Sequence, residues 1–85
     1  MSPVAYRDVS AAFGAVLKTA RAGAGVTQAK LAELADIDRT YPSLLERGLR
    51  EPGLGMVIRL GEALQVDPVL LVRMTLLQLK RTQDA

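Results

Sequence analysis

Two short predicted helices, over residues 28–35 and 39–47, are joined by a three-residue turn with an apolar middle residue. The second helix opens with Arg39 and Thr40 and exposes Ser43, so hydrogen-bonding side chains gather at its N-terminal end. This is the helix-turn-helix plan, in which the second helix lies in the major groove of DNA. A helix fits the groove, which is ~12 Å wide, and its N-terminal side chains reach base edges. The pattern therefore predicts binding to double-stranded DNA.

Positive charge is concentrated in the same segment. Lys and Arg outnumber Asp and Glu only by 11 to 9 over the whole chain. Residues 39–50, however, contain Arg39, Arg47 and Arg50 against the single acid Glu46. A basic segment of this kind favours contact with a phosphate backbone, whereas the alternative is an ordinary solvated loop.

The residue types needed for most catalytic chemistry are absent. The chain has no histidine and no cysteine, which excludes disulfides, thiolate nucleophiles, a histidine base and Cys/His zinc sites. Asp36 and Asp38 flank predicted helix ends, so capping is favoured over a catalytic carboxylate pair. The sequence predicts no enzyme, no metal and no cofactor, and its 85 residues leave no room for a domain that senses a small molecule. Since neither a membrane span nor a signal peptide is indicated, we expect a cytoplasmic protein.

Apolar residues at helical spacing predict five helices and no strand. Ser2-Pro3 begins the first, near 3–22, and Gly25 suits a left-handed cap after it. Thr27 caps the helix at 28–35, and Asp36 can end it. The other helices are expected at 39–47, from Leu54 to Leu64, and at 68–80, followed by a frayed tail from Arg81.

Pro42 leaves two starts open for the third helix. If Asp38 is the cap, Pro42 is the fourth helical residue, where it forfeits a hydrogen bond and crowds the Asp38 carbonyl group. Alternatively the helix begins later, with Thr40 as the cap and Pro42 in the first turn. The second start changes which side chains point into a groove and affects Arg39 most.

Residues 13–72 contain several short runs of residues in a characteristic order and spacing. They are Phe13-Gly14 with Leu17 and Arg21, Gly25-Val26-Thr27-Gln28 with Leu31-Ala32, Asp38-Arg39-Thr40-Tyr41, Glu46-Arg47-Gly48, Pro52 with Leu54, and Leu64 with Val66. This pattern resembles the Cro/repressor-type (XRE-type) helix-turn-helix family. The resemblance implies a compact, all-α, five-helix domain of the lambda-repressor type, with the helix-turn-helix at its second and third helices. It also implies sequence-specific DNA binding as a symmetric homodimer.

The resemblance assigns base reading to Arg39, Thr40, Ser43 and Leu44. Arg39 is expected to hydrogen bond guanine O6 and N7, and Thr40 or Leu44 to touch a thymine methyl group.

Four further residues are assigned to the DNA phosphates. Gln28 and Arg47 match backbone contacts of the family, and Arg50 is a third such contact in the following loop. Lys30 stands where an acid would complete a capping box, and we place it near phosphate as well. These contacts position the protein without reading sequence.

Arg21 and Glu46 match a family pair that forms a buried salt bridge between the first and third helices. We therefore assign both of them a structural role. Removing one partner of a buried pair costs about 3–5 kcal/mol.

The fifth predicted helix is apolar on nearly every face. Its apolar residues are Val69, Leu70, Leu71, Val72, Met74, Leu76, Leu77 and Leu79. Such a helix must be buried on every face, and a domain of 85 residues is too small to enclose it. We assign Leu71, Val72 and Thr75 to the core, and Leu70, Met74 and Leu77 to a homodimer interface.

The sequence is interpreted as a single domain over residues 1–85, with its family-like core at 13–72. We expect a homodimeric repressor or autoregulator that reads a pseudo-palindromic operator. A restriction–modification controller, a phage repressor and an antitoxin remain open within this class. The alternative class is a protein-interaction module that keeps the fold without binding DNA.

Overall fold

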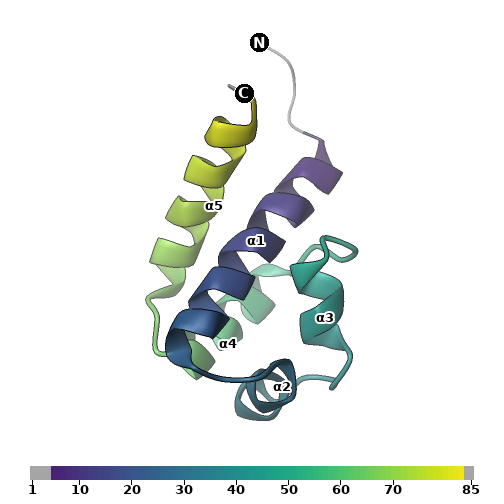
Figure 1. Cartoon of the computed structure of the whole chain (residues 1–85), viewed down its shortest axis with the longest axis vertical. Helices are drawn as coiled ribbons and strands as arrows, with labels where there is room; N and C mark the ends of the chain where they lie inside the picture. The colour runs from purple at the N-terminus through teal and green to yellow at the C-terminus, as the bar shows by residue number, and fades with distance from the viewer. Residues whose placement is uncertain (1–4, 84–85) are drawn as a thin grey trace.

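The computed structural model describes residues 5–83 and contains five α-helices and no strand within that range (Figure 1). The helices are α1 (Tyr6–Ala24), α2 (Gln28–Ala35), α3 (Tyr41–Glu46), α4 (Leu54–Leu64) and α5 (Pro68–Gln83). The long helices α1 and α5 lie side by side, and α2, α3 and α4 pack around one end of this pair. The predicted all-α, five-helix fold is confirmed.

Capping residues set the end of α1 and both ends of α2. Gly25 adopts φ +73° after α1, and its N–H donates to the Ala22 carbonyl oxygen at 3.0 Å. The Thr27 hydroxyl oxygen accepts the N–H of Lys30 at 3.0 Å and caps α2. Asp36 adopts φ +54° and ends α2. These caps are as predicted, whereas the predicted start at Ser2-Pro3 lies outside the described residues.

The third helix begins at Tyr41, so the prediction of a start at residue 39 is wrong. Thr40 precedes the helix and Pro42 falls in its first turn, as in the alternative start. The Asp38 carbonyl oxygen accepts a hydrogen bond from the N–H of Tyr41 at 3.0 Å. This carbonyl group therefore has a partner although Pro42 has no N–H to donate. The late start therefore removes the conflict that proline would create inside a longer helix.

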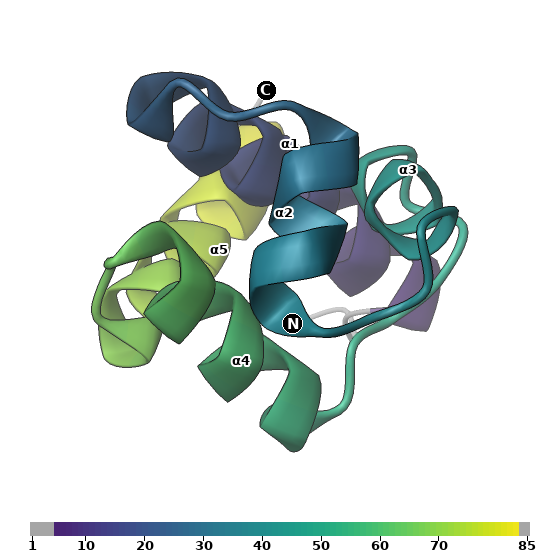
Figure 2. The same ribbon diagram turned by 90° about the horizontal axis from the view of Figure 1, so that it is seen from below.

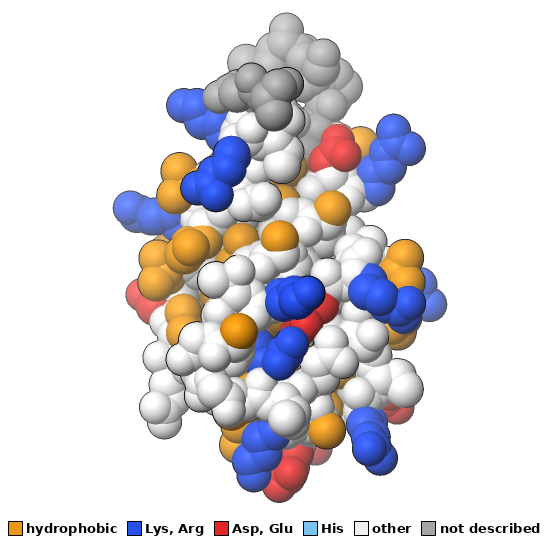
Figure 3. All heavy atoms as spheres, viewed as in Figure 1, with side chains coloured by type: hydrophobic (Ala, Val, Ile, Leu, Met, Phe, Trp, Pro, Cys, Tyr) orange, Lys and Arg blue, Asp and Glu red, His pale blue; other side chains and the backbone are white. Residues whose placement is uncertain are grey.

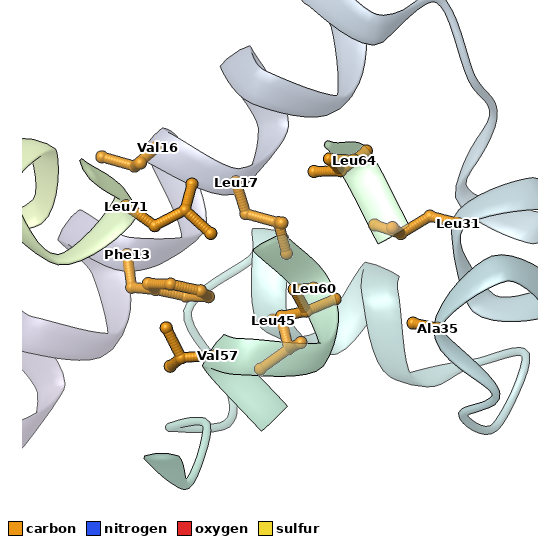
Figure 4. Packing of buried hydrophobic residues seen from close by; sticks show 10 residues of the cluster. All are labelled: Phe13, Val16, Leu17, Leu31, Ala35, Leu45, Val57, Leu60, Leu64 and Leu71. Atoms are coloured by element: carbon orange, nitrogen blue, oxygen red, sulfur yellow. The ribbon is translucent and has the colours of Figure 1, made fainter. Parts of the chain in front are cut away.

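Each helix contributes a fully buried leucine to one hydrophobic core. Leu17, Leu31, Leu45, Leu60 and Leu71 come from α1 to α5 in order and are at most 1% exposed. Figure 4 shows these side chains converging with Phe13, Val16, Ala35, Val57 and Leu64. Replacing such a leucine with alanine costs roughly 2–5 kcal/mol. The core thus fixes the three short helices against the α1–α5 pair.

Helix α5 divides between core and surface. Leu71 and Thr75 are buried as predicted, and the Thr75 hydroxyl donates to the Leu71 carbonyl oxygen at 2.8 Å. Val72 is 44% exposed, so its assignment to the core is wrong. It follows Leu71 directly and is therefore turned about 100° around the helix, off the buried face.

The end of α5 also differs from prediction. The helix continues to Gln83, so the expectation of a frayed tail from Arg81 is wrong for residues 81–83. The Thr82 hydroxyl donates to the Leu79 carbonyl oxygen at 3.0 Å in this last turn. Within residues 5–83, no helix is both long and apolar enough to cross a membrane.

Candidate nucleic-acid interface

Helix α3 lies on the outer side of α1, away from α5, in both views (Figures 1 and 2). Pro42 and Leu45 are buried and hold its inner face. Ser43 and Leu44 are half-buried on the helix, and Arg47 is exposed at its end. The helix is thus anchored by Pro42 and Leu45 and leaves Ser43, Leu44 and the following Arg47 at least partly exposed.

Gly14 allows α3 to approach α1 closely. A methyl group at this position would overlap the carbonyl oxygen of Leu45 and lie 2.8 Å from that of Glu46. Glycine is thus required here by backbone contact, because any larger residue would push α3 away from α1.

The four residues predicted to read bases lie together at the start of α3. Arg39 and Thr40 are exposed in the turn that precedes the helix, and Ser43 and Leu44 follow on its first turns. Arg39 therefore projects from the turn and does not open the helix, as the prediction had it. The residues predicted to read bases therefore lie on a turn and a helix, and not on a helix alone.

Asp38 and Thr40 form a tight hydrogen-bonded turn in front of α3. One carboxylate oxygen of Asp38, Oδ1, accepts the Thr40 main-chain N–H at 2.8 Å and the Thr40 hydroxyl at 2.6 Å. The hydroxyl of Thr40, followed by its N–H, holds the pKa of Asp38 below the usual 3.8. Sequence reasoning treated Asp38 only as a helix cap, and the signal for this turn is the Asp-x-Thr spacing.

The residues predicted to contact phosphate surround this surface but have different local partners. The exposed Arg47 and Arg50 donate to the main-chain oxygens of Ser43 (3.4 Å) and Leu49 (3.2 Å). Lys30 Nζ lies 3.5 Å from the Glu33 carboxylate on the exposed side of α2. Figure 3 shows Lys and Arg side chains at several places along the flank that carries α3.

Gln28 is half-buried and tied to α3. Its side-chain Nε2 donates to Glu46 Oε1 at 3.1 Å. This bond fixes the amide orientation at the N-terminus of α2, where main-chain N–H groups also favour an anion. Gln28 is thus held by the protein before any ligand arrives.

Glu46 accepts hydrogen bonds from α1 and α2 together. Arg21 Nε lies 2.6 Å from Glu46 Oε2 and Arg21 Nη2 lies 3.0 Å from Oε1, while Arg21 Nη1 donates to the Val26 carbonyl oxygen at 2.9 Å. The side chains of Glu46 and Arg21 are only 4% and 17% exposed. The two residues thus join α1, the α1–α2 loop and the end of α3.

This network also sets the charge of both groups. Burial raises the pKa of Glu46, but the hydrogen bonds from Arg21 and Gln28 outweigh burial and bring the pKa below its usual value. The hydrogen bond to Glu46 raises the pKa of Arg21. The pair is therefore ionised at neutral pH.

The sequence matches the model of a family described as a helix-turn-helix domain over residues 12–74. The chain belongs to this family and is a DNA-binding helix-turn-helix transcription regulator of the XRE type. Its family is not one of enzymes. Comparison with curated protein sequences gave no match.

Solved structures of similar proteins support the same fold. The clp gene regulator ClgR from Corynebacterium glutamicum is 26% identical with a TM-score of 0.84, over 99% of this chain and 85% of that one. The restriction-modification controller protein C.AhdI from Aeromonas hydrophila is 36% identical with a TM-score of 0.73, over 78% and 94%. The hypothetical transcription factor NHTF from Neisseria is 27% identical with a TM-score of 0.72, over 84% and 82%.

Proposed function

We propose that the protein is a homodimeric repressor or autoregulator that binds a pseudo-palindromic operator, with one copy of α3 in each of two successive major grooves. The observation that carries this proposal is the outward placement of Arg39, Thr40 and Ser43 at α3. The buried Arg21–Glu46 pair holds the end of the same helix against α1. Under this proposal the surface that contacts DNA is already formed before the protein binds.

Base reading falls to the turn and the first residues of α3. Arg39 is exposed and can hydrogen bond guanine O6 and N7 together, which contributes about 1–3 kcal/mol of discrimination. Thr40 is exposed as well, and Ser43 is half-buried beside it. Leu44 keeps part of its side chain at the surface, where it can touch a thymine methyl group.

Phosphate contacts hold the copies in register. Arg47 and Arg50 supply exposed charge beyond α3, and Lys30 supplies it from α2. Gln28 adds an amide whose orientation Glu46 fixes. With four to six phosphates neutralised per dimer, the logarithm of affinity falls with the logarithm of salt concentration with a slope of roughly −4 to −5.

Dimerisation is proposed to use α5. Leu70, Met74 and Leu77 are 45%, 41% and 55% exposed and form one strip along this helix. Met74 and Leu77 also line a hollow with Ala15 and Val16 of α1, which could receive apolar side chains of a second copy. The rest of its lining is formed by Thr19, Gln78 and Arg81. Figure 3 shows hydrophobic side chains on the side of the molecule that carries α5, away from α3.

The similarity to C.AhdI favours one role within this class. That protein is a restriction-modification controller, and its 36% identity extends over 78% of the present chain. A controller of a restriction–modification operon is therefore our first candidate for the regulated system.

Selection of bound sites from a pool of random duplexes tests the proposal. We expect an inverted repeat whose half-sites are about 10 base pairs apart. Arg7→Ala provides a matched control, because Arg7 is an exposed arginine on α1, outside the residues proposed to contact DNA or a second copy, and its loss should leave the selected site unchanged. A pool without enrichment, and an affinity that does not depend on salt, would contradict the proposal and favour an interaction module.

A further inference from the structure

The Thr40 hydroxyl has a fixed partner in the turn before α3. Its Oγ1 atom lies 2.6 Å from Asp38 Oδ1, and the same oxygen accepts the Thr40 N–H at 2.8 Å. Both residues are exposed on the surface that carries Arg39 and Ser43. The turn is therefore a hydrogen-bonded unit at the place where we expect base edges to lie.

The direction of the bond between the two side chains follows from their chemistry. An ionised carboxylate only accepts hydrogen bonds, whereas a hydroxyl has one proton to donate and two lone pairs that accept. The hydrogen bonds from Thr40 keep the pKa of Asp38 low, so its carboxylate is ionised at neutral pH. The hydroxyl proton of Thr40 consequently points at Asp38, and the lone pairs of the hydroxyl oxygen remain free to accept a hydrogen bond from another group.

Resting on the proposed DNA-reading function, we propose that Asp38 is a specificity-determining positioning residue that makes Thr40 an obligate hydrogen-bond acceptor. In the major groove, adenine N6 and cytosine N4 carry amino groups that donate, whereas guanine O6 and thymine O4 only accept. A Thr40 hydroxyl held by Asp38 therefore selects an amino base on the strand that it contacts. A freely rotating hydroxyl would pair with either kind of base.

The test uses an operator obtained by selection and four proteins: the wild type, Thr40→Val, Asp38→Ala and the double variant. The position read by Thr40 is the one whose preference disappears in Thr40→Val, which keeps the side-chain shape but has no hydroxyl. At this position, adenine is replaced by purine, or cytosine by 2-pyrimidinone, so that only the amino group is lost. The same replacement elsewhere in the site controls for weaker base pairing.

Loss of the amino group should weaken wild-type binding about tenfold and leave Thr40→Val binding unchanged. Reversing the base pair should also cost the wild type about tenfold. In Asp38→Ala this cost should fall to about threefold, because the hydroxyl can turn and donate. Asp38→Ala should add no change in preference to Thr40→Val, since it acts through Thr40. Asp8→Ala, which removes an exposed carboxylate from α1, should behave as the wild type.

Three results would overturn the proposal: no position that depends on Thr40, an amino group whose loss costs nothing there, or an unchanged preference in Asp38→Ala. Thermal melting shows whether each variant is folded. If Asp38→Ala fails to fold, Asp38→Asn keeps the accepting oxygen and should keep the preference, and the amino-group replacement still decides the outcome. A wild type that selects no sequence contradicts the proposed function itself, which separates the two failures.

Discussion

Arg21 and Glu46 lie 25 residues apart and meet through two hydrogen bonds, of 2.6 Å and 3.0 Å, between the guanidinium and carboxylate groups. The pair joins α1 to the last residue of α3, and Gln28 adds a third hydrogen bond to the same carboxylate at 3.1 Å. The group that stabilises the domain thus also sets the direction of the helix that we expect to enter DNA. We therefore expect both stability and DNA recognition to depend on this one buried carboxylate.

Glu46→Ala should strongly destabilise the protein. It leaves the Arg21 guanidinium largely buried without its carboxylate, which costs about 3–5 kcal/mol. For a domain of this size, that cost corresponds to a fall in the melting temperature of roughly 12 °C or more. Thermal denaturation followed by circular dichroism measures it, with Glu51→Ala, which removes an exposed glutamate, as the control. An unchanged midpoint in Glu46→Ala contradicts the structural role.

Acid should destabilise the fold through protonation of the same residue, Glu46. Because the folded-state pKa of Glu46 is below its usual 4.5, the ionised carboxylate stabilises the fold above that value. This stability is lost as the pH falls from about 4.5 through the folded-state pKa. Glu46→Gln should be less stable than the wild type at pH 7, and the difference should shrink towards pH 3. Melting curves at several pH values test this, and a difference that stays constant with pH would refute it.

The helix ends that the sequence predicts correctly depend on single residues acting locally. Gly25 and Asp36 stop helices because they adopt left-handed backbone, and Thr27 caps α2 with its own hydroxyl. The start of α3 was ambiguous because Asp38 and Thr40 are both acceptable caps. The structure has the later start, which places Pro42 in the first turn of the helix, where its missing N–H forfeits no intrahelical hydrogen bond.

The candidate site was predictable in its residues but not in its geometry. The order of residues around Arg39 identifies a helix-turn-helix, and the Asp-x-Thr spacing is compatible with a turn, but the spacing alone does not say that Thr40 donates its hydroxyl proton to Asp38. That contact depends on side-chain rotamers in the folded turn. Similarly, Leu71 and Val72 are both apolar, and only the packing of α5 against the core separates the buried one from the exposed one.

Gly14→Ala should destabilise the domain by pushing α3 away from α1. The added methyl group would overlap the carbonyl oxygen of Leu45, which is main chain and cannot turn aside. Overpacking of this kind costs about 1–3 kcal/mol. Gly23→Ala is the matched control, because it lies in the same helix with nothing within 4 Å of the new methyl group. Urea denaturation should show a loss for Gly14→Ala and an unchanged or increased stability for Gly23→Ala.

Arg39→Ala and Arg47→Ala should weaken DNA binding in different ways. Arg39 is proposed to read a base, so its loss should relax preference at one position per half-site by roughly 1–3 kcal/mol. Arg47 is proposed to contact phosphate, so its loss should weaken binding to all sequences alike and reduce the salt slope by about 1 for each contact removed. Binding to the selected site and to a scrambled duplex, at several salt concentrations, separates the two. Equal losses on both duplexes for both variants contradict this division of roles.

Removing the proposed dimer strip should give a monomer that still folds. Leu70→Ser combined with Leu77→Ser replaces two exposed leucines on the α5 strip, so the core stays intact while apolar contact with a second copy is lost. Sedimentation at micromolar concentration should show twice the chain mass of 9.1 kDa for the wild type and 9.1 kDa for the variant.

A second exposed apolar strip on the other flank of α5 supplies a matched control for this experiment. Leu54 of α4 and Leu76 of α5 are 75% and 61% exposed there, so Leu54→Ser combined with Leu76→Ser removes the same number of leucines from the surface. We expect that variant to remain dimeric. If it becomes monomeric while Leu70→Ser with Leu77→Ser stays dimeric, the copies meet across α4 and α5, and the assignment of Leu70, Met74 and Leu77 is wrong. A wild type that sediments as a monomer rules out the homodimer altogether.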